Sequence, residues 1–196
     1  VAAILDALGE GEIADRETTA GIRGLEAWEV EAAVGPETVA LAASAAPSAE
    51  GDIPVLAAVA ARHKLPLIVD AAAQLPPAIN LRRYFEQGAS LVVFSGGKAI
   101  GGPQASGILA GRRDLVASAA LQMLDMDVRP EAFEPPAEFF PDGAPPALPR
   151  HGIGRGFKAS KEAIVGLLAA LDAFVARDWD KAERSVRRRL ARYARE

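Results

Sequence analysis

The chain alternates between short apolar runs and longer segments in which apolar residues recur every three or four positions. Short apolar runs bounded by Gly, Pro or polar residues are typical of buried β-strands, and the longer periodicity is typical of helices that bury one face. Strands are predicted at residues 38–43, 65–70, 90–94 and 106–110. Helices are predicted at residues 25–34, 53–64, 80–87, 112–123 and 160–176, followed by an arginine-rich helix.

This order of elements predicts the fold class and the domain organisation. Strands that alternate with helices at this spacing indicate βαβ units, so we expect an α/β fold with a mainly parallel sheet, flanking helices and further C-terminal helices. Residues 1–124 are predicted to form the α/β domain, 125–150 a proline-rich excursion from it and 151–196 a helical segment. Because the chain begins at Val1 and ends inside a charged helical pattern, we expect it to be a piece of a longer polypeptide.

Composition excludes several classes of protein. The chain contains no cysteine, which excludes disulfides, thiolate zinc sites and a cysteine nucleophile, and no metal site is predicted. No run of about eighteen apolar residues and no signal-peptide pattern is found, so we expect a cytoplasmic protein without a membrane span.

The net charge of −4 argues against a broad nucleic-acid-binding surface. The local exception is the arginine-rich segment from Arg184 to Arg195, which follows Asp178, Asp180 and Glu183 at helical spacing. Charges at this spacing favour a solvated, self-paired helix face over a nucleic-acid patch.

The segment from Leu91 to Gly107 carries the most distinctive pattern, an apolar strand that leads into a glycine-rich turn with one lysine, Lys98. Ligands of open parallel α/β sheets bind at the carboxyl ends of the strands. Asp70 ends one predicted strand, and Ser95 and Lys98 follow the end of the next. We therefore expect a carboxylate, a hydroxyl and an amine at one edge of the sheet, with glycines that permit positive φ angles and close approach to a ligand.

Three classes of cofactor site can be compared with this pattern. A Walker A loop is excluded, because Ala99 follows Lys98 and Val92 stands where the first glycine belongs. A dinucleotide fingerprint does not fit the spacing of Gly96, Gly97 and Gly101. Pyridoxal phosphate (PLP) requires a lysine, an acid at the pyridinium nitrogen and donors for its phosphate, and these residue types are present at the predicted edge.

Three motifs resemble a known family. They are VDAAAQLPP at 69–77, FSGGKAIGGPQASGILAG at 94–111 and GIGRGFKASKEAIVGLLAAL at 152–171. They are similar to the selenocysteine-synthase-like group of fold-type I PLP enzymes, which includes L-seryl-tRNA(Sec) selenium transferases and D-glucosaminate-6-phosphate ammonia-lyases. The resemblance runs from about Leu25 to Ala176. It implies that residues 1–124 belong to a PLP-binding large domain and that residues 151–196 lead toward a small C-terminal domain.

The resemblance implies roles for the residues at the predicted edge. Lys98 is expected to form the Schiff base with PLP and then to act as a catalytic base. Asp70 is expected to face the pyridinium nitrogen, Ser95 to bind the phosphate and Gln74 to reach the phenolic oxygen. Each residue also has a structural alternative, such as a solvated lysine for Lys98 or a turn cap for Asp70.

A basic segment further along resembles the family's substrate-anion site. Arg155 and Lys158 are the implied anion-binding residues, and His151 beside the adjoining glycines is a further candidate for substrate binding or for a structural role. An arginine is commoner in the family at the position of Lys158, and a lysine cannot form the same bidentate contact.

The resemblance implies a PLP-dependent lyase or transferase that acts at the β-carbon of an amino acid through an aminoacrylate. We expect a small amino-acid-type substrate and a homodimer or larger homo-oligomer, whereas the acidic net charge disfavours tRNA without excluding it. The alternatives are a seryl-tRNA selenium transferase proper, or a non-catalytic fragment or binding module that lacks the upstream half of the site. Cysteine desulfurase is excluded, because the chain has no cysteine and Gly97 precedes Lys98.

Overall fold

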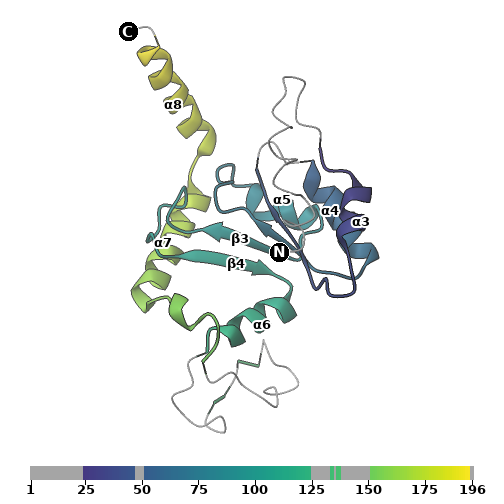
Figure 1. Cartoon of the computed structure of the whole chain (residues 1–196). Coiled ribbons are helices and arrows are strands. Elements are labelled where there is room, and N and C mark those ends of the chain that lie inside the picture. The colour runs from purple at the N-terminus through teal and green to yellow at the C-terminus, as the bar shows by residue number, and fades with distance from the viewer. Residues whose placement is uncertain (1–23, 47–50, 125–132, 135, 138–150, 195–196) are drawn as a thin grey trace.

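Figure 1 shows a computed structural model of the chain, which describes residues 24–46, 51–124, 133–134, 136–137 and 151–194. The proline-rich excursion predicted at 125–150 lies almost entirely outside the described residues, as does the segment before residue 24.

The strands form one four-stranded sheet in the order β1-β2-β3-β4. β1 (Leu41–Ser44), β2 (Leu67–Asp70) and β3 (Leu91–Ser95) are parallel, and β4 (Gly107–Gly111) runs antiparallel to β3. The prediction of an α/β fold with a mainly parallel sheet is confirmed. The helices are α3 (Ala27–Ala33), α4 (Asp52–Arg62), α5 (Asn80–Glu86), α6 (Arg113–Gln122), the 3-10 helix η4 (Arg155–Phe157), α7 (Lys161–Ala176) and α8 (Trp179–Tyr193).

Two predicted boundaries were wrong by a few residues for identifiable reasons. The first strand begins at Leu41 rather than Thr38, because Thr38 closes a turn in which its hydroxyl accepts a hydrogen bond from the Gly35 amide at 2.9 Å. α4 ends before Lys64, whose φ of 56° is left-handed. The next amide, that of Leu65, donates back to Ala60 O at 2.8 Å, so Leu65 terminates the helix instead of starting β2.

One face of the sheet carries the core. Leu41, Leu67, Val69, Val92 and Phe94 alternate along the three parallel strands and are almost fully buried. They pack against Ile53, Leu56 and Val59 of α4 and Tyr84 of α5. This is the alternation expected of strands that bury one face, and it orients the opposite side chains away from these helices.

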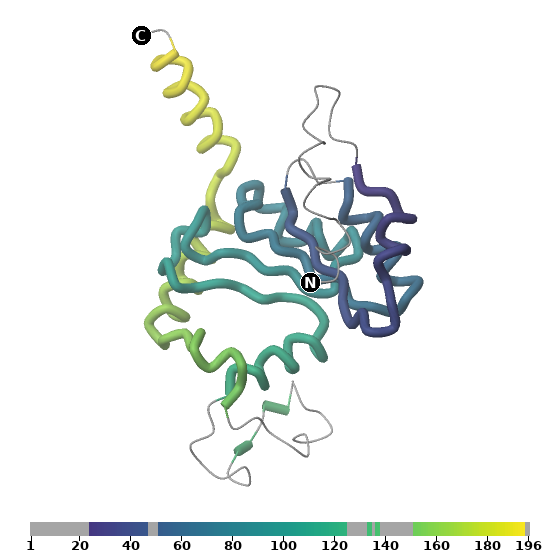
Figure 2. Tube along the Cα trace, viewed as in Figure 1, coloured from purple at the N-terminus to yellow at the C-terminus, as the bar shows by residue number. Residues whose placement is uncertain are grey.

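A second apolar cluster joins α7 to the same side of the sheet. Leu167 and Phe174 of α7 pack with Ile100 from the loop after β3, and Leu81 of α5 and Ile108 of β4 pack against this cluster. The tube in Figure 2 shows that α7 passes the loop end of β3 and β4 before the chain continues into α8. α8 projects away from the rest of the molecule (Figure 1), and none of its described side chains is buried.

The opposite face of the sheet is much less covered at its carboxyl edge. Residues paired across neighbouring strands lie on the same face. Ser44 pairs with Asp70, and Asp70 pairs with Val93, so these side chains share a face with Ser95, two residues beyond Val93. Ser44 and Asp70 are exposed, whereas Val93 and Ser95 are half-buried. We call this the open face of the sheet.

Candidate functional site

The carboxyl edge of the open face brings together polar side chains from three neighbouring strands. Ser44 ends β1, Asp70 ends β2 and Ser95 ends β3. Parallel strands lie about 4.8 Å apart and rise about 3.3 Å per residue, so Ser44 and Ser95, which are two strands and two residues apart, lie roughly 12 Å from each other. An edge of this length can contact a ligand the size of a substituted pyridine ring at several points.

The Asp70 carboxylate is oriented by its own turn. Its Oδ1 accepts a hydrogen bond from the Ala72 amide at 2.9 Å, and among the described residues no group donates to Oδ2. The following backbone is fixed to β3, because the Ala71 amide donates to Val93 O at 2.9 Å. Asp70 thus caps the turn, which is its structural alternative, and its other carboxylate oxygen is free at the edge for a ligand.

Lys98 lies in a tightly bonded loop between β3 and β4. The Gly102 amide donates to Gly96 O at 2.8 Å, the Gly101 amide donates to Lys98 O at 3.0 Å and the Gly96 amide donates to Ser106 O at 2.9 Å. The Lys98 side chain is exposed, and no described group forms a hydrogen bond or an ion pair with its ammonium. The loop backbone is therefore fixed while the amine is available to a ligand.

The glycines of this loop allow other segments of the chain to lie close to the loop backbone. A Cβ on Gly96 would lie 2.2 Å from Ser106 Oγ and 2.7 Å from Leu167 Cδ1, and a Cβ on Gly97 would lie 2.6 Å from Gln104 Cα. Gly101 has the positive φ that we expected, at 77°, with nothing within 4 Å of a Cβ there. The close approach that we attributed to a ligand is made at Gly96 and Gly97 by the 103–106 segment and by α7.

Gln74 lies on the turn after β2. Asn80, which is buried at the start of α5, donates from Nδ2 to the Gln74 carbonyl at 2.7 Å, and the Gln74 amide donates to Ala71 O at 3.0 Å. These bonds fix the backbone of the turn that follows Asp70. The Gln74 side chain is half-buried and has no hydrogen-bond partner among the described residues.

The three predicted substrate-binding residues lie on another segment. His151, Arg155 and Lys158 are exposed, and this segment is attached to the end of α6, where the Gly154 amide donates to Gln122 O at 2.7 Å and the Gly152 amide to Leu124 O at 3.0 Å. Neither Asp70 nor Lys98 is bonded to any of the three within the part of the chain that the structure describes.

Sequence reasoning missed Ser44. The apolar run at residues 38–43 was predicted to end one residue earlier, so this serine was counted in the loop. Its pairing with Asp70 places it on the same face at the same edge. The signal was present as a polar residue directly after an apolar strand, as for Asp70 and Ser95.

The described residues contain no group of three or more His, Asp or Glu side chains that could hold a metal ion. They also contain no helix that is both long enough and apolar enough to cross a membrane.

A solved structure shares the fold of this chain. The chain superposes on a solved structure of D-glucosaminate-6-phosphate ammonia-lyase with a TM-score of 0.57 and 28% sequence identity, covering 81% of this chain and 36% of the lyase. Its sheet and helices therefore have the fold of part of a fold-type I PLP enzyme.

Comparison of sequences shows which proteins the chain is similar to. The family model of L-seryl-tRNA selenium transferase matches residues 48–131. A D-glucosaminate-6-phosphate ammonia lyase of Salmonella typhimurium is 30% identical over 151 residues, which are 75% of this chain and 32% of the lyase. A 5'-C-glycyluridine monooxygenase-decarboxylase of Streptomyces sp. is 34% identical over 121 residues, which are 62% of this chain and 22% of that relative.

These matches confirm that the chain is related to the selenium-transferase-like group of fold-type I PLP enzymes. The chain spans a third or less of the length of these two curated relatives. The matched region contains Asp70, Gln74, Ser95 and Lys98.

Proposed function

We propose that this chain forms part of a PLP-dependent lyase or transferase that acts at the β-carbon of an amino acid, with PLP held at the carboxyl edge of the open face. The observation that carries the proposal is the shared edge of Asp70 and Ser95 beside the fixed loop of Lys98. The side-chain chemistry fits the cofactor, because a free carboxylate oxygen, a hydroxyl and an exposed amine match a pyridinium nitrogen, a phosphate and an aldehyde. Relatedness to a group of PLP enzymes supports the same assignment.

The residues at this edge have distinct tasks in this proposal. Bound PLP supplies an electron sink that stabilises negative charge at the α-carbon of an amino acid. Asp70 keeps the ring nitrogen protonated through its free oxygen, while Ala72 holds the other oxygen in place. Ser95 donates a hydrogen bond to the phosphate. Lys98 would be the covalent attachment point for the cofactor and, as a free amine, would take the α-proton of the substrate.

The remaining assignments belong to the same proposal. Gln74 contacts the phenolic oxygen from the turn after β2. Arg155 and Lys158, with His151 beside them, bind an anionic group of a small amino-acid-type substrate. We propose a cytoplasmic homo-oligomer, in which residues 1–124 are the PLP-binding portion and 151–196 lead toward a smaller domain.

The names of the relatives include a lyase, a transferase and a monooxygenase-decarboxylase. We favour a lyase or transferase reaction, because the family model is named for a transferase and the superposed structure is that of a lyase. We favour a small-molecule substrate, because the lyase is named for D-glucosaminate 6-phosphate. A tRNA substrate is disfavoured by the acidic net charge of −4.

A product assay tests the reaction. The protein is loaded with PLP and incubated with β-substituted amino acids, including sugar-derived amino acids that carry a phosphate. We expect ammonia and a keto acid in equal amounts, with both lost in Lys98→Ala and retained in Lys64→Ala. If PLP binds at Lys98 but no β-substituted amino acid releases ammonia or accepts a nucleophile, the chain is a binding module and the proposed reaction is wrong.

A further inference from the structure

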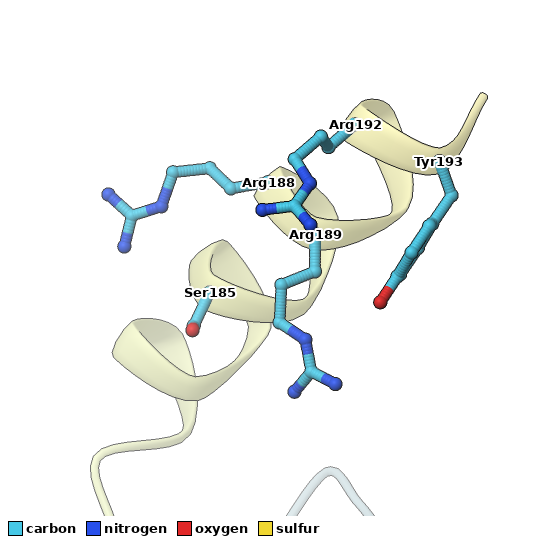
Figure 3. A pocket seen from close by; sticks show the side chains of 5 residues that line it. All are labelled: Ser185, Arg188, Arg189, Arg192 and Tyr193. Atoms are coloured by element: carbon cyan, nitrogen blue, oxygen red, sulfur yellow. The ribbon is translucent and has the colours of Figure 1, made fainter. Parts of the chain in front are cut away.

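α8 carries an open hollow of ≈ 450 Å³ (Figure 3), but its lining is that of a solvated helix surface. The prediction of a self-paired helix face holds for Arg187, whose Nη2 lies 2.7 Å from Glu183 Oε1. None of the described side chains of α8 is buried. The hollow is lined by Ser185, Arg188, Arg189, Arg192 and Tyr193, which are all exposed. A buried polar side chain elsewhere in the molecule gives a more specific signal.

That side chain is Asn80, which is 4% exposed and is the one buried polar or charged residue in the part of the chain that the structure describes. It begins α5 and lies four residues before Tyr84, so both residues face the core side of this helix. Burial of a side-chain amide costs free energy unless its polar atoms are hydrogen-bonded. The amide therefore indicates a task that an apolar side chain could not perform.

The hydrogen bonds of the Asn80 side chain identify that task. Nδ2 donates to the Gln74 carbonyl at 2.7 Å, whereas Oδ1 is buried without a donor among the described residues. The unpaired oxygen lowers the stability of the fold and the Nδ2 bond raises it, so the two effects largely offset each other. Stability alone thus gives little reason for an asparagine here. What the amide provides is a fixed position for the backbone of Gln74.

The turn after β2 is held on both sides of Gln74. Before it, Ala71 is fully buried, and its amide donates to Val93 O of β3 at 2.9 Å. After it, Leu75 packs against both apolar clusters. The bond from Asn80 adds a direct connection from α5 to the peptide unit of Gln74 itself. The backbone of this residue is therefore fixed from the sheet, from the core and from α5.

The side chain of Gln74 contrasts with this fixed backbone. It is half-buried and has no hydrogen-bond partner among the described residues. A long side chain loses rotamer freedom when it binds a ligand, and the loss is smaller when the backbone that carries it is already in place. A backbone held in this way presents the free amide of Gln74 in a limited range of positions beside Asp70.

We propose that Asn80 is a positioning residue for Gln74, and that its Nδ2 bond holds the Gln74 backbone where the side-chain amide can donate to the phenolic oxygen of PLP. This inference rests on the proposed function, because it takes PLP as the ligand. It extends the site from the residues that contact the cofactor to the helix behind them.

Binding of PLP to variants tests this role. Asn80→Leu removes the donor at nearly constant volume. We expect Gln74→Ala to raise the dissociation constant of PLP by about tenfold and Asn80→Leu by about threefold or more. Both should shift the absorbance maximum of bound PLP in the same direction. In the Gln74→Ala background, Asn80→Leu should add less than about twofold, because the bond then has no side chain to position.

Gln87→Leu is the matched control. Gln87 follows the last residue of α5, and its Oε1 is also buried without a partner among the described residues. This variant removes a comparable amide at the far end of the same helix, so the dissociation constant of PLP should stay within about twofold of wild type. Thermal unfolding verifies that the variants fold, and Asn80→Ala replaces Asn80→Leu if the leucine is not accommodated.

Amide hydrogen exchange without PLP measures the hold of Asn80 directly. The Gln74 amide donates to Ala71 O at 3.0 Å, and the Ala89 amide donates to Tyr84 O at 2.9 Å beyond the other end of α5. In Asn80→Leu we expect the Gln74 amide to exchange about tenfold faster or more, and the Ala89 amide to stay within about threefold of wild type.

The outcomes separate this inference from the proposed function. If wild type binds PLP at Lys98 but Asn80→Leu leaves affinity and absorbance unchanged, or adds in full to Gln74→Ala, the inference is wrong and the proposed function stands. If wild type binds no PLP at Lys98, the proposed function is wrong and PLP is not the ligand that Gln74 contacts. Exchange at Gln74 that Asn80→Leu does not change overturns the hold of Asn80 on this turn in either case.

Discussion

Gly96 illustrates how single residues set the position of Lys98. Its backbone lies between Ser106 and Leu167, so the first residue after Ser95 must lack a side chain for the loop to close on α7. Gly102 completes the same loop, and its amide donates back to Gly96 O at 2.8 Å. The loop glycines therefore act on the lysine indirectly, by fixing the backbone that carries it.

Gly96→Ala should destabilise the protein by about 2 kcal/mol, because the added methyl overpacks a buried contact with backbone and side-chain atoms on two sides. Gly35→Ala is the matched control, since nothing lies within 4 Å of a Cβ at that position. Denaturant unfolding of both variants measures the difference. Equal stability of Gly96→Ala and wild type would show that the loop does not close on α7 in this way.

The sequence predicted where the polar residues of the candidate site lie along the chain, but it did not predict the tertiary contacts of the loop glycines. The placement of Asp70 and Ser95 at strand ends was predictable, because polar residues interrupt apolar runs there. The contacts of Gly96 with Ser106 and Leu167 were not, since they join segments through tertiary packing that no local pattern encodes. Ser44 was missed because a turn at Thr38 shifts the strand toward the carboxyl end.

At the scale of elements, a charged cluster holds α3 against α4. Arg62 donates from Nε to Glu31 Oε1 at 2.7 Å, and His63 bonds to the other carboxylate oxygen of Glu31. Hydrogen bonds from His63 and then from Arg62 lower the pKa of Glu31. Cross-helix contacts of this kind were beyond sequence reasoning, which placed both helices without their relative orientation.

Glu31→Gln should therefore lower the thermal stability at neutral pH more than Glu37→Gln, an exposed control. A carboxyl group whose pKa is lowered on folding stabilises the folded state. The full contribution is present above the pKa of the unfolded chain, at about pH 4.3. This contribution is lost as the pH falls further, through the lowered pKa of the folded state. Melting curves of the three proteins from neutral to acidic pH measure it, and a Glu31→Gln deficit that persists in acid would contradict the assigned cause.

At the scale of the whole molecule, the sheet has one packed face and one open face. The short apolar runs predicted buried strands, and the βαβ pattern predicted a mainly parallel sheet, whereas the strand order comes from the structure. The open face could not be predicted, because the sequence does not show which side of each strand the helices cover. Its exposed carboxyl edge is where the proposed site lies.

Phe94→Ala should lower the free energy of unfolding by about 3–5 kcal/mol, because Phe94 is 2% exposed on the packed face and its removal leaves a cavity. Leu109→Ala is the control on the other face, where Leu109 is 38% exposed and should cost under about 1.5 kcal/mol. Urea unfolding distinguishes the two. Similar losses for both variants would mean that the open face is also packed.

Chemical trapping of the cofactor tests the central claim most directly. The chain is incubated with PLP, reduced with borohydride and digested, and the modified lysine is identified by peptide mapping. We predict label on Lys98 that is absent in Lys98→Ala, and little label on Lys64 or Lys161. A folded chain that takes up no specific label at Lys98, or takes it up equally at the other lysines, would contradict the assignment of this edge as a PLP site.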